Sequence, residues 1–248
     1  MNIIIPSYKR SDNLIGKDYF NMAKYCVPES QEKEYIKVLG KKRVIILPDD
    51  EDGNIVKKRN WILKNIPRPL IMIDDDVCSL QYWNERKEDY LRRKFPSELL
   101  DDLFNEMISL SKQFNSYLFG IAQNTDDRQF REQLPFSLSN IILGPFQGHL
   151  DHDLLFDERV GSKDDYDMAL QHLNKYKKVL RLNKYAYDCK HGDNSGGIVS
   201  YRSKDKEIEY CKAIMRKWGK RIIEYQIPPK KMTDLLNAKK VNVPIGGV

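Results

Sequence analysis

Three consecutive carboxylates, Asp74, Asp75 and Asp76, are the residues of this sequence best suited to chemistry. They follow the apolar run 70–73, which predicts a buried strand. Side chains alternate along an extended segment, so we expect Asp74 and Asp76 to point to one side and Asp75 to the other. Two neighbouring carboxylates repel unless a cation lies between them. Oxygen ligands suit Mg²⁺ or Mn²⁺, so the sequence predicts a metal held by Asp74, Asp76 and the phosphates of a substrate.

Alternating strands and helices must position these carboxylates. This alternation predicts right-handed crossovers and a mostly parallel central sheet in an α/β fold, in which ligands bind beyond the carboxyl ends of the strands. The loop 7–12 and the three Asp residues both leave strands at that edge. The pattern predicts strands at 3–6, 25–27, 43–47, 70–73, 116–121, 134–143 and 179–182, and helices at 20–24, 31–39, 54–65, 97–114, 163–176 and 203–218.

The bulk composition indicates one domain with a basic end. A chain of 248 residues, 41% hydrophobic, suffices for one sizeable core. Residues 201–248 carry 12 Lys and Arg against 5 Asp and Glu. Their local net charge of +7 (12 − 5) exceeds the net charge of +6 of the whole chain. Clustered basic charge with interleaved aromatic residues suits a polyanion, and a solvated helix face explains it equally well. The candidate phosphate contacts are Arg92, Arg93, Lys94, Arg216, Lys217, Lys220 and Arg221.

The sequence also predicts where the protein acts. The four cysteines are scattered and show no CxxC spacing, which fits free thiols in a reducing compartment. No apolar stretch approaches membrane-spanning length. The chain opens directly with a strand-like segment, so we expect no signal peptide and a cytoplasmic location.

An ordered set of motifs resembles the GT-A glycosyltransferases of the family-2-like kind. The set consists of Ile-Pro-Ser-Tyr-Lys-Arg at 5–10, Lys-Arg-Asn at 58–60, the Asp triplet as the DxD motif, and Lys-Asp-Asp-Tyr-Asp-Met at 163–168. The resemblance implies a single Rossmann-like GT-A domain over 1–248. Residues 1–77 would form its nucleotide-sugar-binding half, 78–200 its acceptor and catalytic half, and 201–248 a basic C-terminal extension.

The resemblance also implies roles for individual residues. The donor is a nucleoside-diphosphate sugar, and uridine diphosphate is the family's commonest carrier. Asp74 and Asp76 hold Mn²⁺ or Mg²⁺, with His191 as a further ligand or, equally, a structural histidine. Arg59 faces the diphosphate, which suits a charge-assisted contact. The other donor-binding candidates are Pro6, Ser7, Tyr8, Arg10, Asn60 and Asp75.

The pair Asp164-Asp165 matches the family's acidic pair at a helix start. By this resemblance Asp165 is the general base that takes a proton from the acceptor hydroxyl in an inverting transfer. Acidic residues also favour the helix dipole at this position, which is the structural alternative. The first member here is Asp164 where the family has Glu.

A narrower resemblance is to the TET-associated glycosyltransferases. It is carried by Val-Pro-Glu-Ser-Gln at 27–31 with Tyr35, Ile-Ile-Leu-Pro at 45–48, Arg-Asn-Trp-Ile-Leu at 59–63 and Met-Ile-Asp-Asp-Asp-Val at 72–77. That family is largely phage-encoded and implies a DNA acceptor bearing 5-hydroxymethylcytosine. Such a base is reached in the major groove or by flipping it out of the helix.

Three other readings remain open. The chain could glycosylate a glycan or small molecule, although it lacks a membrane segment. A metal-dependent phosphohydrolase or nuclease would combine the Asp triplet with the His- and Asp-rich segment 148–153. A non-catalytic nucleic-acid-binding module would leave the Asp triplet unexplained, because carboxylates repel phosphate unless a metal intervenes.

Overall fold

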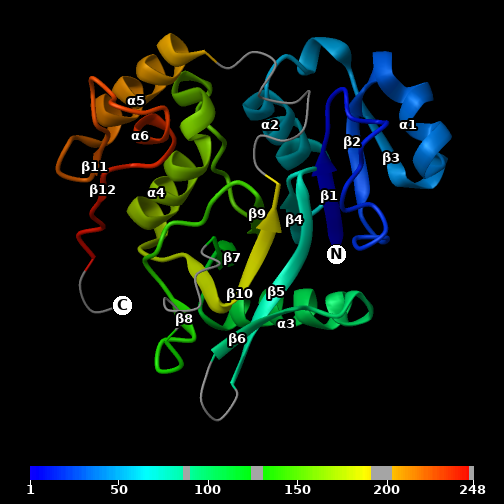
Figure 1. Ribbon diagram of the computed structural model, residues 1–248, viewed down its shortest axis with the longest axis horizontal. Coiled ribbons are helices and arrows are strands. Elements are labelled where there is room, and N and C mark those ends of the chain that lie inside the picture. The colour runs from blue at the N-terminus through cyan, green and yellow to red at the C-terminus, as the bar shows by residue number, and fades with distance from the viewer. Residues whose placement is uncertain (86–89, 124–130, 191–202, 246–248) are drawn as a thin grey trace.

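A central sheet forms the frame of the protein in this computed structural model (Figure 1). The structure describes residues 1–85, 90–123, 131–190 and 203–245. Among these residues the sheet has ten strands, in the order β3-β2-β1-β4-β9-β7-β10-β5-β6, with β8 paired to β10. The strands are β1 (Asn2–Pro6), β2 (Lys24–Pro28), β3 (Val44–Leu47), β4 (Leu70–Ile73), β5 (Val77–Glu85), β6 (Tyr90–Lys94), β7 (Leu118–Ala122), β8 (Phe136–Ser137), β9 (Phe146–His149) and β10 (Leu180–Cys189).

Most strands of this sheet run in one direction. The neighbours β3, β2, β1 and β4 are mutually parallel, as expected from the crossovers through helices α1 (Glu32–Leu39) and α2 (Ile55–Asn65). Strand β9 lies antiparallel between β4 and β7, so β7 and its parallel neighbour β10 regain the first direction. The prediction of an α/β fold with a mostly parallel sheet is therefore confirmed, and the carboxyl ends of β1, β4, β7 and β10 share one edge.

Helices cover both faces of the sheet with separate apolar cores. Strand alternation divides β1 between them: Ile3 and Ile5 face α3 (Leu100–Gln113), whereas Ile4 faces α2 and α4 (Asp164–Tyr176). Asn54 starts α2 by accepting a hydrogen bond from the Lys57 N–H at 2.8 Å. These caps and apolar faces are the features that made the helices predictable.

The C-terminal residues pack on the α4 side of the sheet. Helix α5 (Lys204–Trp218) lies within the helix predicted at 203–218, begins after the Ser203 cap, and buries Cys211 and Ile214 in the core shared with α4. Figure 1 shows α5 with the short α6 (Thr233–Leu236), β11 (Ile223–Glu224) and β12 (Lys240–Val241) gathered beside α4. None of the described helices is long and apolar enough to cross a membrane.

Two predicted elements are wrong, and five strands were not predicted, two of them the short β11 and β12. Residues 20–22 form turns before β2, although a helix was predicted at 20–24. Only Phe136–Ser137 is strand within the stretch predicted at 134–143, and Gly144 and Pro145 follow. The hairpin of β5 and β6 and the strand β9 were missed, because charged residues and a Gly interrupt their apolar pattern.

Candidate functional site

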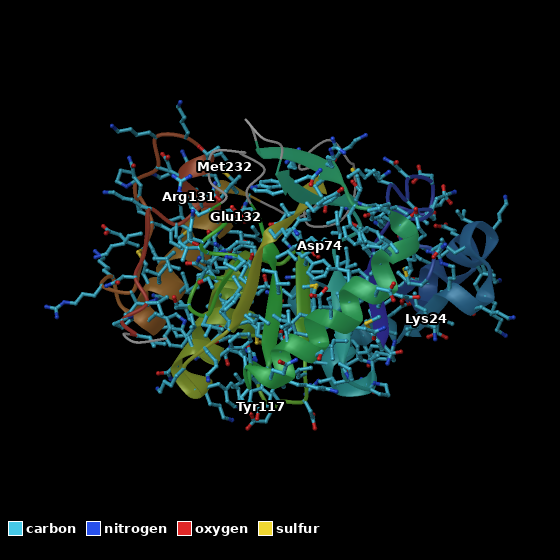
Figure 2. All side chains as sticks on the ribbon, turned by 90° about the horizontal axis from the view of Figure 1, so that it is seen from below. Lys24, Asp74, Tyr117, Arg131, Glu132 and Met232 are labelled. Carbon is cyan, nitrogen blue, oxygen red and sulfur yellow. The ribbon has the colours of Figure 1, made fainter. Side chains whose placement is uncertain are left out.

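The predicted site residues meet at the shared carboxyl edge of the strands. Ser7 follows β1, Asp74 follows β4, Lys190 follows β10, and α4 begins there with Asp164. In Figure 2 Asp74 lies near the middle of the molecule. Tyr117, which precedes β7, lies toward the opposite end of the strands.

The three carboxylates form a turn, which corrects the extended geometry expected from sequence. The Val77 N–H donates to the Asp74 carbonyl at 3.1 Å, closing a turn that leads directly into β5. The three side chains consequently reach three different partners. Asp74 meets Arg59, Asp75 meets the loop after β1, and Asp76 accepts from the Cys189 thiol at 3.0 Å.

Asp75 ties the metal motif to the loop after β1. Its carboxylate accepts from the Ser7 hydroxyl at 2.6 Å and forms an ion pair with Arg10. The Tyr35 hydroxyl from α1 lies 2.7 Å from the Ser7 hydroxyl and accepts from the Arg10 N–H at 3.0 Å. Burial raises the pKa of Asp75, and Arg10 and Ser7 oppose that rise. The network fixes the shape of the first loop before any ligand arrives.

Arg59 joins the metal motif to the start of α4. Its Nη2 donates to Asp74 at 2.7 Å and its Nη1 to Asp164 at 2.6 Å, and its side chain is only 4% exposed. The backbone approaches this guanidinium closely at Gly144, where a Cβ would lie 2.8 Å from Nη2. Arg59 thus binds two carboxylates, whereas the sequence predicts that it contacts the diphosphate of the donor. These two bonds also hold the side chains of Asp74 and Asp164 in a fixed position relative to each other.

Asp165 lies beside this ion-pair chain. Its Oδ2 accepts from the Gly144 N–H at 3.0 Å, and its Oδ1 accepts from the N–H of Tyr166 at 2.7 Å. Burial and the neighbouring Asp164 raise the pKa of Asp165, while the Gly144 N–H and Arg59 lower it. A carboxylate with a raised pKa, held by backbone donors, suits a general base.

The charges around the Asp triplet favour a bound cation. Burial raises the pKa of Asp74 to about 7; Arg59 opposes the rise and Asp76 adds to it. Ionising Asp74 therefore carries an electrostatic cost that a divalent cation would lower. No group of three or more His, Cys, Asp or Glu side chains is arranged for a metal among the described residues. Mg²⁺ is usually bound through one or two carboxylates plus substrate phosphates, so Asp74 and Asp76 fit that pattern.

Two of the remaining residues predicted to bind the donor lie at the end of β1 and in the loop after it, and a third holds another segment of the chain. Pro6 ends β1, and Tyr8 lies in the following loop with the Lys58 Nζ 5.6 Å from its ring centroid. The Asn60 amide is already engaged at both ends by the backbone of Phe156, at 2.8 and 2.9 Å, so it holds that segment. His191 lies outside the described residues.

Sequence reasoning missed Lys58, Tyr35 and Cys189 as members of the site. Lys58 is 3% exposed, donates to the Ser7 carbonyl at 2.6 Å and pairs with Asp52 at 3.3 Å. Burial lowers its pKa, and Asp52 opposes that effect. The position of Lys58 directly before Arg59 was a usable signal, whereas Tyr35 and Cys189 become neighbours of the site only through the fold.

A comparison with known protein families shows to which family the chain belongs. The model of the TET-associated glycosyltransferases matches residues 1–197. The chain belongs to this family. It is therefore a glycosyltransferase, as the narrower resemblance implied. No curated protein matches the chain significantly.

The family match covers every element of the site at the carboxyl edge. It includes the loop after β1, the Asp triplet and the start of α4. It ends before α5, so the family model leaves the C-terminal residues beyond 197 unassigned. The described part of that segment, beginning with α5, nevertheless packs in the core shared with α4.

A second polar cluster lies at the opposite end of the sheet. His149, His152 and His172 are all buried, and the Nδ1 of His149 lies 3.0 Å from the Nε2 of His152. His149 pairs with Leu70 at the start of β4, four residues before Asp74 and thus about 13 Å along the strand. The segment 148–153 therefore does not join the Asp triplet in one site.

This histidine cluster should make the protein acid-labile. Burial lowers the pKa of His152 to about 3 and of His172 to about 4, and that of His149 well below its usual value. The unfolded chain binds protons more readily, so stability is lost as pH falls below about 6.5 toward these folded values. We expect a loss approaching 1.4 kcal/mol per pH unit for each histidine. Urea unfolding between pH 7.5 and 5 measures it; a flat free energy of unfolding over that range would contradict the prediction.

Proposed function

We propose that this glycosyltransferase moves a sugar from a nucleoside-diphosphate sugar, with uridine diphosphate as the best candidate carrier, to the hydroxyl of 5-hydroxymethylcytosine in DNA. The observation that carries the proposal is the meeting of Asp74, Asp76 and Asp165 at one sheet edge, linked through Arg59 and Asp164. One edge thus offers carboxylates for a phosphate-bound cation and a separate carboxylate for proton removal.

The proposed donor lies over the ends of β1 and β4. Ser7 and Arg10 lie in the first loop and Lys58 donates to its backbone, and such cationic and hydroxyl groups suit a nucleoside diphosphate. Asp74 and Asp76 would hold Mn²⁺ or Mg²⁺. Such a cation, when bound, stabilises the charge that develops on the departing diphosphate.

Asp165 performs the proton transfer in this proposal. The acceptor oxygen forms a bond to the anomeric carbon, and the bond from that carbon to the diphosphate oxygen breaks with its electron pair leaving on the diphosphate. The hydroxyl proton passes to the Asp165 carboxylate, which is the role of a general base in an inverting transfer. Asp164, held by Arg59, positions this end of α4.

The direct test is a transfer assay. The protein is incubated with Mn²⁺, a panel of nucleotide sugars and DNA containing 5-hydroxymethylcytosine, and the DNA is then digested to nucleosides and weighed by mass spectrometry. A nucleoside heavier by one hexose or related sugar supports the proposal. Transfer to glycans or small alcohols without transfer to DNA would instead favour the glycan acceptor.

The phosphohydrolase alternative loses its main argument in this structure. It needs the segment 148–153 beside the Asp triplet, and the register of β4 with β9 separates them. The same assay tests it, because a phosphohydrolase would release phosphate without a modified acceptor.

If DNA is the acceptor, exposed cations near α5 should contact its backbone. Arg216, Lys220 and Arg221 are exposed, whereas the Lys217 Nζ already binds Asp157 at 2.9 Å and Asp167 at 2.8 Å. On duplex DNA each phosphate neutralised adds about −0.9 to the slope of log affinity against log salt. Replacing the three exposed residues with Gln should flatten that slope by roughly 2–3 units.

The control for this salt experiment is Lys217→Gln. Because two carboxylates already neutralise Lys217, its replacement should leave the slope nearly unchanged. The other basic candidates, Arg93 and Lys94 on β6, are exposed as well, while Arg92 lies 5.9 Å over the Trp83 ring. If the triple variant kept the wild-type slope, the exposed cations near α5 would not contact DNA phosphates.

A further inference from the structure

A cavity of about 350 Å³ lies beside Asp165. Its walls include Leu143 and Tyr166, which immediately flank the hydrogen bond between Gly144 and Asp165. Small-molecule sites span roughly 300–1,000 Å³, so this cavity has room for one small group and none for a duplex.

The strand order separates this cavity from the proposed donor side. The cavity is bounded by Ile121 of β7, Gln123 just after it, and Arg181 of β10. Ser7 and the donor loop follow β1, on the other side of β4 and β9. Asp74 and Asp165 therefore stand between the two places, where a sugar would pass from donor to acceptor.

Among the described residues that line this cavity, Arg181 is the one with a cationic side chain. Its Nε donates to the Asn183 side chain at 3.0 Å, and no carboxylate of the described residues pairs with it. Burial lowers the pKa of Arg181, and nearby Tyr187 opposes that effect. A guanidinium has only donors, so its remaining N–H groups favour a carbonyl or anionic oxygen on a ligand.

The other walls favour a nucleobase over a phosphate. Neutral polar groups of Gln123, Ser139 and Asn140 can match the mixed donors and acceptors of a base edge. Apolar side chains such as Val241 and Val243 can cover the faces of a ring. None of the described lining residues is a lysine, whereas phosphate sites commonly gather several cations.

We propose that this cavity receives the acceptor pyrimidine, extruded from a duplex or taken from a single strand, and that Arg181 donates to a carbonyl oxygen on its pairing edge. The proposal rests on the proposed function and adds the recognition site. Enzymes that modify a base commonly flip it into a pocket and recognise its pairing edge by hydrogen bonds. The 5-hydroxymethyl group would then point toward Asp165.

This assignment gives the C-terminal residues a role. Val241 and Val243 lie beyond residue 197, where the family match ends, yet they form one wall of the cavity. Acceptor selection would thus combine Arg181, which lies within the matched range, with a wall formed by the C-terminal segment.

The test compares the binding of two short single-stranded oligonucleotides by fluorescence anisotropy. One carries a single 5-hydroxymethylcytosine and the other an abasic site at that position, so the ratio of their affinities cancels the phosphate contacts. We expect the wild type to prefer the base by about 10-fold or more. Arg181→Gln should bring the ratio close to 1 by removing a charged hydrogen bond.

Two further variants keep this test decisive. Asn140→Trp, an exposed position on the cavity, should block the base and remove the preference even if the Arg181 variant folds poorly. Arg159→Gln makes the same change at a side chain that is 82% exposed and should keep the wild-type ratio.

The proposal is overturned if the wild type shows no preference for the base. It is also overturned if Arg181→Gln weakens both oligonucleotides equally, which would assign Arg181 to a phosphate. Sugar transfer by the wild type, measured separately, tests the proposed function. Transfer with an unchanged affinity ratio in both cavity variants would reject only the acceptor site.

Discussion

Replacing Asp165 with Asn should lower kcat by about 10²–10⁴-fold, because the amide cannot accept the proton of the acceptor hydroxyl. The change preserves the size of the side chain and one of its two bonds to backbone N–H groups. Donor affinity should therefore remain close to that of the wild type. Steady-state kinetics with separate titration of donor and acceptor measures both quantities.

The pH profile gives an independent check on this role. Because burial and Asp164 raise the pKa of Asp165, wild-type activity should fall with decreasing pH at a value above that of an ordinary carboxyl group. That acid limb should disappear in the Asn variant. Asp164→Asn is the matched control, since Asp164 is bonded to Arg59 and should affect kcat less. A loss of donor affinity with kcat reduced less than tenfold would make Asp165 a binding residue.

Replacing Asp76 with Ala should abolish turnover, with a loss of at least about 100-fold in metal-dependent donor affinity. Changing groups around metal ligands already costs 10–100-fold, and a ligand itself should cost more. Calorimetric titration of the nucleotide sugar with and without Mn²⁺ separates the metal-dependent part. The wild type should gain affinity from Mn²⁺ and the variant should not.

The fold of the Asp76 variant should be nearly unaffected. The substitution removes one of two close carboxylates together with the hydrogen bond that Asp76 accepts from the Cys189 thiol. Asp151→Ala, at a fully exposed carboxylate whose side chain is 100% accessible, is the control. Full wild-type activity in excess chelator would reject the metal assignment.

The sequence predicted the parallel half of the fold well. Apolar runs, the Asn54 and Ser203 caps and the Asp triplet mark their elements locally, so strand and helix placement followed from short windows. The strands β5 and β6 escaped prediction because polar and charged residues interrupt their apolar pattern, and β9 escaped it because its pairing partners also lie far away in sequence. Phe146 in β9 pairs with Ile73 in β4, for example.

The candidate site was likewise predictable only in part from the sequence. The residue types at Asp74, Asp76 and Asp165 were visible in the sequence, but their connections were not. The bond from Arg59 to Asp164 spans 105 residues, and Cys189 reaches Asp76 across 113. Such contacts depend on tertiary packing. The bonds from Arg59 to two carboxylates are an example, and the predicted contact of Arg59 with the diphosphate stays a prediction. Arg181 also gave no local signal.

The ion pair between Lys163 and Glu207 affects which truncated forms of the chain would fold stably. The Lys163 Nζ lies 2.8 Å from the Glu207 carboxylate, both side chains are 1% exposed, and Ser162 donates to the same carboxylate. Removing one partner of a buried pair leaves an uncompensated charge, which typically costs about 3–5 kcal/mol. A fragment that stops at residue 197 would keep Lys163 and lose Glu207 with the whole of α5. The limit of family similarity is thus not a limit of independent folding, and the lysine destabilised by such a cut lies directly before the two acidic residues that open α4.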